Sequence, residues 1–220
     1  MSNIRTRAYS SDRKIPLSRA LPYTLYMPFG VFASALSEYK VFFLTAHILG
    51  TVLGLGGATI ADFLFFRFLK DYKISAKECD VLNTLKGIIL SALGLIIVSG
   101  VGLFLTDMQL YSSSGPFVSK MLIVGIITIN GIALHLVVAP HLLRLDLKRH
   151  QRRHRRWRRM AFTLGAVSVC SWYSAFFIAM LKSVLPQNFS ILFGGYLVAL
   201  MFALLMSQVI ERRLAAQAQG

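Results

Sequence analysis

Acidic residues and cysteines are scarce in this chain. It has 9 Asp and Glu against 24 Lys and Arg in 220 residues, while 55% of its residues are hydrophobic. So little acidic surface beside so much apolar composition excludes an ordinary soluble domain of this length. The two cysteines, Cys79 and Cys170, form no CxxC pair and have no metal-ligand spacing. We therefore expect two free thiols with packing roles.

Familiar motifs of soluble enzymes are absent as well. The chain has no P-loop, no HExxH sequence and no nucleophile elbow, and Gly54, Gly56 and Gly57 lie in an apolar run where they cannot cradle a phosphate. A net charge of +15 would indicate nucleic-acid binding in a soluble protein. The chain has neither a recognition motif nor a globular domain to aim one, so we expect no nucleic-acid partner.

What the chain has instead is a series of long apolar runs. Each is near or above the roughly 20 residues that span about 30 Å of hydrocarbon. The runs cover residues 41–66, 88–106, 116–143, 160–185 and 190–210. They predict an all-α, polytopic transmembrane bundle of five helices in the lipid bilayer. Its four-helix core occupies residues 40–185, and a fifth helix with a polar tail occupies residues 186–220.

Residues 1–39 form a region of their own. Basic residues dominate residues 1–20, and the moderately apolar stretch 21–36 is interrupted by Pro22 and Pro28. This pattern superficially matches a signal peptide with a basic n-region. A short extra span and an interfacial helix are the alternatives. We expect a basic arm followed by a membrane-associated segment that is retained.

Two local signals predict where helices begin. Ser75-Ala76-Lys77-Glu78 has the form of a capping box, so the second core helix is expected to start near Ser75, outside the hydrocarbon. In the Ser-rich stretch 112–116, Pro116 suits the first turn of a helix, where its missing N–H is harmless.

A basic block before the fourth helix predicts the topology. By the positive-inside rule the loop 144–159 is cytoplasmic. Because successive helices cross the membrane in alternating directions, the C-terminus is cytoplasmic as well. The expected location is a bacterial inner membrane. The same block offers a surface for anionic lipid head groups or an acidic partner, although topology alone explains most of it. Its basic residues are Arg144, Lys148, Arg149, Arg152, Arg153, Arg155, Arg156, Arg158 and Arg159.

The first core helix carries one histidine and one carboxylate at membrane depth, His47 and Asp62. Ionisable side chains are expensive there and are functional candidates by default. Asp62 follows His47 by 15 residues, which returns it to within roughly 60° on the helix wheel, about 22 Å along the axis. Between them run Gly50, Gly54 and Ala58, which allow close approach of another helix, the commoner use, or of a flat cofactor.

The third core helix has a matching pair, Lys120 and His135, also 15 residues apart. Since the first and third helices run in the same direction, His47 is expected at the depth of Lys120 and Asp62 at the depth of His135. The first pair is interpreted as a catalytic and cofactor-binding site near the outer face, and the second pair as a proton relay. Snorkelling to the interface is the alternative for Lys120 and Asp62.

Haem b is the first cofactor to consider, with His47 as its metal ligand and Gly50, Gly54 and Lys120 around it. A haem held by two histidines needs both at one depth, and each level offers one. The second ligand would therefore be a different residue, or the haem would be shared across a homo-oligomer.

A resemblance rests on short motifs. Ala46-His47-Ile48-Leu49-Gly50 lies early in the first core helix, and Ser119-Lys120-Met121-Leu122-Ile123-Val124 opens a later one, followed by His135 and an Arg/His-rich loop. This arrangement resembles the HemJ-type protoporphyrinogen oxidases and the CopD-like integral membrane families. The resemblance implies a four-helix core, a functional pair at His47 and Lys120, and haem. Asp62 stands where HemJ-type proteins carry a cation, so the chain is identified as a distant relative within the wider superfamily.

The leading hypothesis from the sequence is a haem-linked membrane oxidoreductase for electron or proton transfer. The alternatives are a transporter-like protein that handles ions or metals, and a structural membrane subunit.

Overall fold

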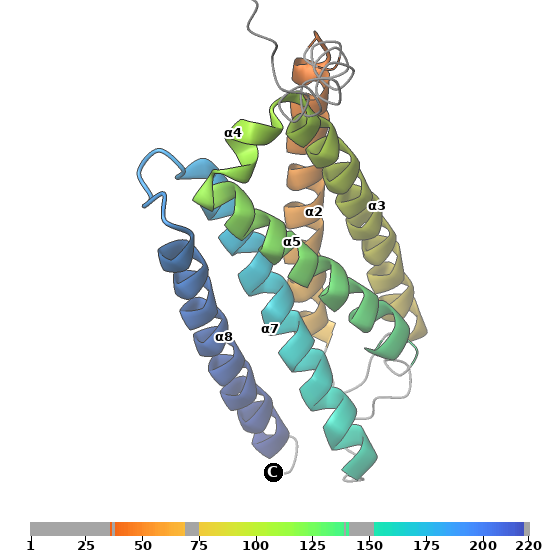
Figure 1. Cartoon of the computed structure of the whole chain (residues 1–220). Helices are drawn as coiled ribbons and strands as arrows, with labels where there is room; N and C mark the ends of the chain where they lie inside the picture. Colours follow the sequence, from red (N-terminus) through yellow and green to blue (C-terminus); the bar gives the residue numbers. More distant parts are fainter. Residues whose placement is uncertain (1–35, 37, 69–74, 139, 141–151, 218–220) are drawn as a thin grey trace, which may run out of the picture.

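The computed structural model describes residues 36, 38–68, 75–138, 140 and 152–217. Within these ranges the chain is helical and forms no strand. Five helices are long and apolar enough to cross a membrane, which confirms the predicted all-α polytopic bundle (Figure 1). The expectations for the basic arm and for residues 21–35 lie outside the described residues.

The first two long helices form an antiparallel hairpin, α2 (Lys40–Phe68) and α3 (Ala76–Thr106). The predicted capping box at the start of α3 is confirmed. The Glu78 backbone N–H donates to Ser75 Oγ at 3.3 Å, and the Ser75 backbone N–H donates to Glu78 Oε2 at 2.8 Å. Both bonds satisfy backbone donors that the first turn of a helix leaves unpaired.

A short helix, α4 (Met108–Ser112), leads into α5 (Gly115–Ala133), which begins with Pro116 in its first turn as predicted. A single π-helical turn, η2 (Leu134–Val138), continues α5. Of the predicted span 116–143, residues 139 and 141–143 lie outside the described residues.

The last two long helices are α7 (Arg152–Met180) and α8 (Phe189–Gln217). Both extend beyond the apolar runs that predicted them. The second half of the expected basic loop 144–159 is helical from Arg152, and the expected polar tail after residue 210 is helical to Gln217. Charge marks where the chain leaves the hydrocarbon, whereas arginine, glutamate, alanine and glutamine all favour continuing the helix into the aqueous side.

The helices pack as two groups. α2 packs along α3, while α5 and α8 pack on α7, and the hairpin meets the second group chiefly where α2 crosses α7. α2 and α5 run in the same direction, as predicted (Figure 1). They are not direct partners, however, because α5 packs mainly on α7. A site formed directly between the first and third core helices, as expected from their matched residues, therefore has little shared interface to occupy.

Hydrogen bonds between helices hold the second group together. Ser171 on α7 and Tyr196 on α8 are both buried, and their hydroxyl oxygens lie 2.9 Å apart. Tyr173, also on α7, lies 3.1 Å from Thr59 on α2, measured between their oxygens. Two hydroxyl-bearing residues of α7, Ser171 and Tyr173, are therefore used for contacts between helices.

A buried ion cluster joins α7 to α8 where α2 ends and α7 begins. We call this end of the bundle the basic end. Glu211 is 1% exposed, and its Oε1 accepts from Arg158, with Nε and Nη2 both at 2.6 Å. Arg159 Nε lies 3.6 Å from Glu211 Oε2. These two arginines, expected to bind lipid head groups, thus face a carboxylate inside the protein.

Removing the carboxylate should loosen α8. We expect Glu211→Gln to cost on the order of 3 kcal/mol, because it leaves the largely buried Arg158 without its counter-charge. The measurement is the midpoint of thermal unfolding in detergent. Arg213→Gln is the control, since Arg213 is exposed two residues away. Equal midpoints for the two variants would contradict a stabilising role for the cluster.

Candidate functional site

Helix α2 presents its predicted site residues on two faces. His47 and Gly50 face α3, whereas Gly54 and Asp62 face α7. The roughly 60° between His47 and Asp62 on the helix wheel is enough to bring them against different neighbours. The single polar stripe expected from the sequence is thus split between two interfaces.

His47 is tied to α3 by its ring nitrogen Nδ1. This nitrogen lies 3.1 Å from the Ile96 carbonyl oxygen and 3.1 Å from Ser99 Oγ. A carbonyl only accepts, so Nδ1 carries the hydrogen; the Ser99 hydroxyl is itself 2.5 Å from the Leu95 carbonyl, to which it donates. In the neutral ring the lone pair is then on Nε2, the atom left for a proton or a ligand.

His47 lies in the first half of α2 and Lys120 in the first turns of α5, and the starts of these two helices lie at the same end of the bundle (Figure 1). Within the described part of the chain no hydrogen bond joins His47 to Lys120, because His47 Nδ1 is directed at α3. The predicted pair lies at the same end of the bundle, but no hydrogen bond joins its two side chains in the described ranges.

The space beside the two glycines that were expected to make room for a cofactor is occupied by neighbouring side chains and backbone. A Cβ at Gly50 would lie 2.9 Å from Ile96 Cγ1 and 3.1 Å from the Ala92 carbonyl oxygen. At Gly54 it would lie 2.4 Å from the Trp172 indole. A macrocycle at these positions would have to displace α3 or Trp172. The donor atom of His47 suits haem iron, but the space at Gly50 and Gly54 does not.

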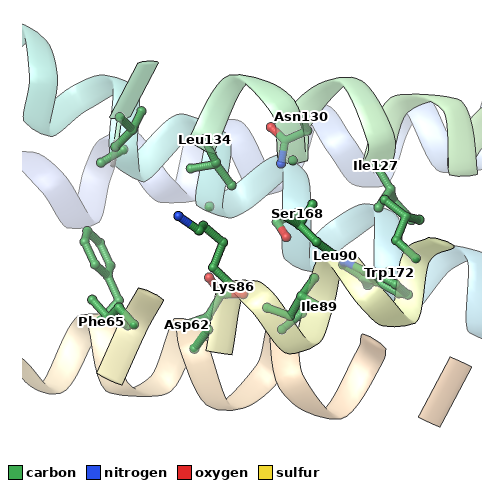
Figure 2. Close-up of a pocket in the computed structure, with 18 of the residues that line it drawn as sticks. Asp62, Phe65, Lys86, Ile89, Leu90, Ile127, Asn130, Leu134, Ser168 and Trp172 are labelled. Carbon is green, nitrogen blue, oxygen red and sulfur yellow. The ribbon is translucent and has the colours of Figure 1, made fainter. Parts of the chain in front are cut away.

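Asp62 lies near the basic end and lines a cavity of about 170 Å³ between α2, α3, α5 and α7. Its Oδ1 faces the backbone of Gly165 on α7, 3.8 Å from where a Cβ would stand. Figure 2 shows the cavity with Asp62 and Lys86 on one side and Asn130 and Leu134 on the other. Most of the walls are aliphatic or aromatic. The polar side chains that line the cavity are Asp62, Asn83, Lys86, Asn130 and Ser168.

His135 does not share this cavity with Asp62. The stripe that lines the cavity on α5 and η2 runs through Ile127, Gly131, Leu134 and Val138, and it passes beside His135, which is exposed. The π-helical turn also changes the angular step per residue, so a wheel drawn at about 100° fails at this point. The structure therefore does not bring the expected proton-relay partners together.

Lys86 takes the place that His135 was expected to fill. It approaches the cavity from α3, and its Nζ donates to Asn83 Oδ1 at 3.3 Å. In the described ranges no basic side chain lies within 4.0 Å of the Asp62 carboxyl; the ion pairs found there belong to Glu211. One acid and one base thus share a cavity without forming a direct pair.

Asn130 is the second polar group that the sequence reasoning missed. It is 5% exposed, and its Nδ2 donates to the Leu164 carbonyl at 3.1 Å. Its Oδ1 has no hydrogen-bond partner among the described residues. An amide within an apolar run was a usable signal, as was a lysine 11 residues after the Ser75 cap. Asn130 is neither acidic nor basic and Lys86 lies on the second core helix, so neither belongs to the ionisable pairs of the first and third core helices.

Comparison with known proteins adds no assignment. No family model matches the chain, and neither a curated protein nor a solved structure does. Among the described residues there is also no cluster of three or more His, Cys, Asp or Glu that would hold a metal ion.

The packing of Trp172 on Gly54 can be tested directly. Gly54→Ala should destabilise the protein by about 1–3 kcal/mol, because the added methyl overlaps the indole ring. Gly56→Ala is the matched control, since a Cβ there meets nothing within 4 Å. Thermal unfolding of both variants in detergent gives the comparison. Trp172→Phe should restore part of the loss in a Gly54→Ala background, and an additive double variant would sink this explanation.

Proposed function

We propose that this multi-pass membrane protein handles protons and a small ligand at the cavity around Asp62. The observation that carries the proposal is an acid and a base from neighbouring helices, Asp62 and Lys86, lining one cavity inside the membrane-spanning bundle. A transporter-like, ion-handling role agrees with this arrangement better than a purely structural one, because a structural pair would be in direct contact.

Burial explains why Asp62 is suited to this role. An ionised carboxylate without a paired charge is costly in an apolar cavity, so it takes up a proton or pairs with a donor. Lys86 is near enough to share the cavity, but it is hydrogen-bonded to Asn83. The contents of the cavity therefore decide whether Asp62 is charged. Ligand occupancy and proton uptake are coupled through that single group.

Chemical labelling tests whether Asp62 behaves as a protonatable group in an apolar cavity. A lipid-soluble carbodiimide adds to protonated carboxyl groups in apolar surroundings. We expect it to modify Asp62 in the purified protein and to leave Glu211 unmodified, because Glu211 is held by Arg158. Peptide mass spectrometry reads out both sites.

Two glycine variants on α5 provide the controls for labelling. A Cβ at Gly131 or at Gly125 meets nothing within 4 Å, but only Gly131 lines the cavity. Gly131→Leu should fill the cavity and reduce labelling of Asp62 severalfold, while Gly125→Leu should leave it unchanged. Labelling of Asp62 at the parent level in Gly131→Leu would overturn the assignment of the functional centre to this cavity.

His47 supports a second candidate function, haem binding. Its Nδ1–H is held by a backbone carbonyl, the arrangement that orients a ligating histidine and leaves Nε2 for a metal. The motif resemblance around His47 and Lys120 points the same way. Haem would supply one-electron transfer when bound. Haem beside Gly50 and Gly54 would have to displace Ile96 and Trp172, which pack against these two glycines.

Absorption spectroscopy tests this second candidate. If His47 ligates haem, native preparations should show a Soret band that His47→Ala removes. The absence of the band, together with identical spectra of parent and variant after haem addition, would exclude the candidate without touching the Asp62 proposal.

We further propose a bacterial inner-membrane location with the basic end in the cytoplasm. The described basic side chains at that end support it under the positive-inside rule. They are Arg67, Lys77, Arg156, Arg158, Arg159, Arg212 and Arg213. All of these except Arg158 and Arg159 are exposed, and within the basic block Arg156 is therefore available to anionic lipid head groups.

A further inference from the structure

We infer that the cavity around Asp62 binds an uncharged, lipid-soluble molecule with one six-membered ring and a carbonyl or hydroxyl group. Quinone head groups and phenols belong to this class. The inference rests on the proposed function, since it names the ligand of the same cavity. Size, charge balance, access and hydrogen-bonding capacity each support it.

The volume of the cavity selects a single ring. An apolar protein cavity of about 150 Å³ is known to accept benzene. The cavity here has a volume of about 170 Å³ and is lined by Ile89, Leu93, Ile127 and Trp172 on its more deeply buried side. It is therefore large enough for one substituted ring and too small for a tetrapyrrole.

Charge balance in the cavity favours a neutral ligand. The ionisable groups that line it are one carboxyl, Asp62, and one amine, Lys86, beside the thiol of Cys79. A ligand with a net charge would compensate one of the two charges and leave the other unpaired in an apolar site, which is costly. A neutral ligand adds no uncompensated charge to the site, whether or not Asp62 carries its proton.

Access to the cavity is from the hydrocarbon side. α3 packs along α2, whereas α5 packs on α7 and α8, so α3 and α5 form facing walls that are not packed tightly on one another. Leu90 on α3 lines the cavity and is 36% exposed. A molecule dissolved in the bilayer can therefore reach the cavity between α3 and α5 without crossing water.

The polar groups fit a carbonyl or a hydroxyl. Lys86 Nζ and the Ser168 hydroxyl are donors to a carbonyl oxygen, and the Asp62 carboxyl accepts from a hydroxyl. In Figure 2 the Lys86 amine extends between Asp62 on one side and Leu134 on the other. A ring-borne oxygen there would complete hydrogen bonds that Asp62 and Lys86 do not make to each other. Mostly apolar walls with a few such groups are typical of small-molecule sites.

Trp172 makes the inference measurable. The chain has 2 tryptophans, Trp157 and Trp172, and Trp172 lines the cavity. Trp157→Phe leaves Trp172 as the single tryptophan, and a short-chain benzoquinone quenches indole fluorescence at contact. Titration of this variant in detergent should give saturable quenching. If Trp157→Phe fails to fold, the titration is done on chains that keep both tryptophans. The signal from the cavity is then the difference in quenching between Gly131→Leu and Gly125→Leu.

Variants of the cavity separate binding from random collision. Gly131→Leu should abolish the saturable phase, and Lys86→Met should weaken apparent binding about tenfold through loss of a charged hydrogen-bond donor. Gly125→Leu should bind like the parent. Quenching that rises linearly, with the same slope in Gly131→Leu and Gly125→Leu, would overturn the inference.

Carbodiimide labelling distinguishes the two ways of failing. If the benzoquinone does not bind but Gly131→Leu still blocks labelling of Asp62, the ligand class is wrong and the cavity remains the functional centre. If Gly131→Leu affects neither labelling nor quenching, the proposed function fails together with the ligand class.

Discussion

The hydrocarbon interior offers no hydrogen-bond partners, so every polar side chain buried in this bundle needs a partner within the protein. That constraint helps to determine which helices pack against each other. His47 finds the Ile96 carbonyl and attaches α2 to α3, and Ser171 finds Tyr196 and attaches α7 to α8. Glu211, completely enclosed, finds Arg158 at the basic end. Contacts between the mostly apolar helix faces are not specific for one neighbour. These few polar contacts make the pairing of helices specific.

The cavity is the place where the constraint is not met by direct pairing. Asp62 and Lys86 line one space without an ion pair, and in the described part of the chain Asn130 Oδ1 is buried nearby without a partner. Elsewhere in the same bundle the buried Glu211 forms ion pairs with two arginines, so direct pairing of a buried charge does occur in this protein. Sites that depart from the rules obeyed by the rest of a protein are commonly functional. The departure at Asp62 therefore supports the proposed function more strongly than the presence of an acid alone.

Local features of the fold were predictable from the sequence, and neighbour relations were not. Ser75 with Glu78 and the position of Pro116 depend on interactions within one turn, so they mark the starts of α3 and α5 correctly. Which face of α2 meets which helix depends on Ile96 against Gly50 and Trp172 against Gly54, contacts between residues far apart in sequence. Hydrophobic periodicity reports that a face is buried but not by what. The cavity and the separation of Asp62 from His135 depend on such contacts and could not be predicted from the sequence, whereas Lys86 and Asn130 were visible as polar residues in apolar runs but not as neighbours of Asp62.

The two ends of α2 are enclosed differently, which bears on the chemistry proposed for each. At His47 the neighbouring helix is close: Gly100 of α3 faces the imidazole, 3.3 Å from where a Cβ would stand, and one ring nitrogen is already committed. At Asp62 the neighbours stand back and leave a space shared by four helices. A group packed against backbone is fixed in orientation, which suits a ligand to a metal or a structural bond. A group facing open space can change partner or charge state, and this is what exchange of a proton or a ligand requires. The physical distinction between the two ends thus favours Asp62 over His47 as the centre of exchange.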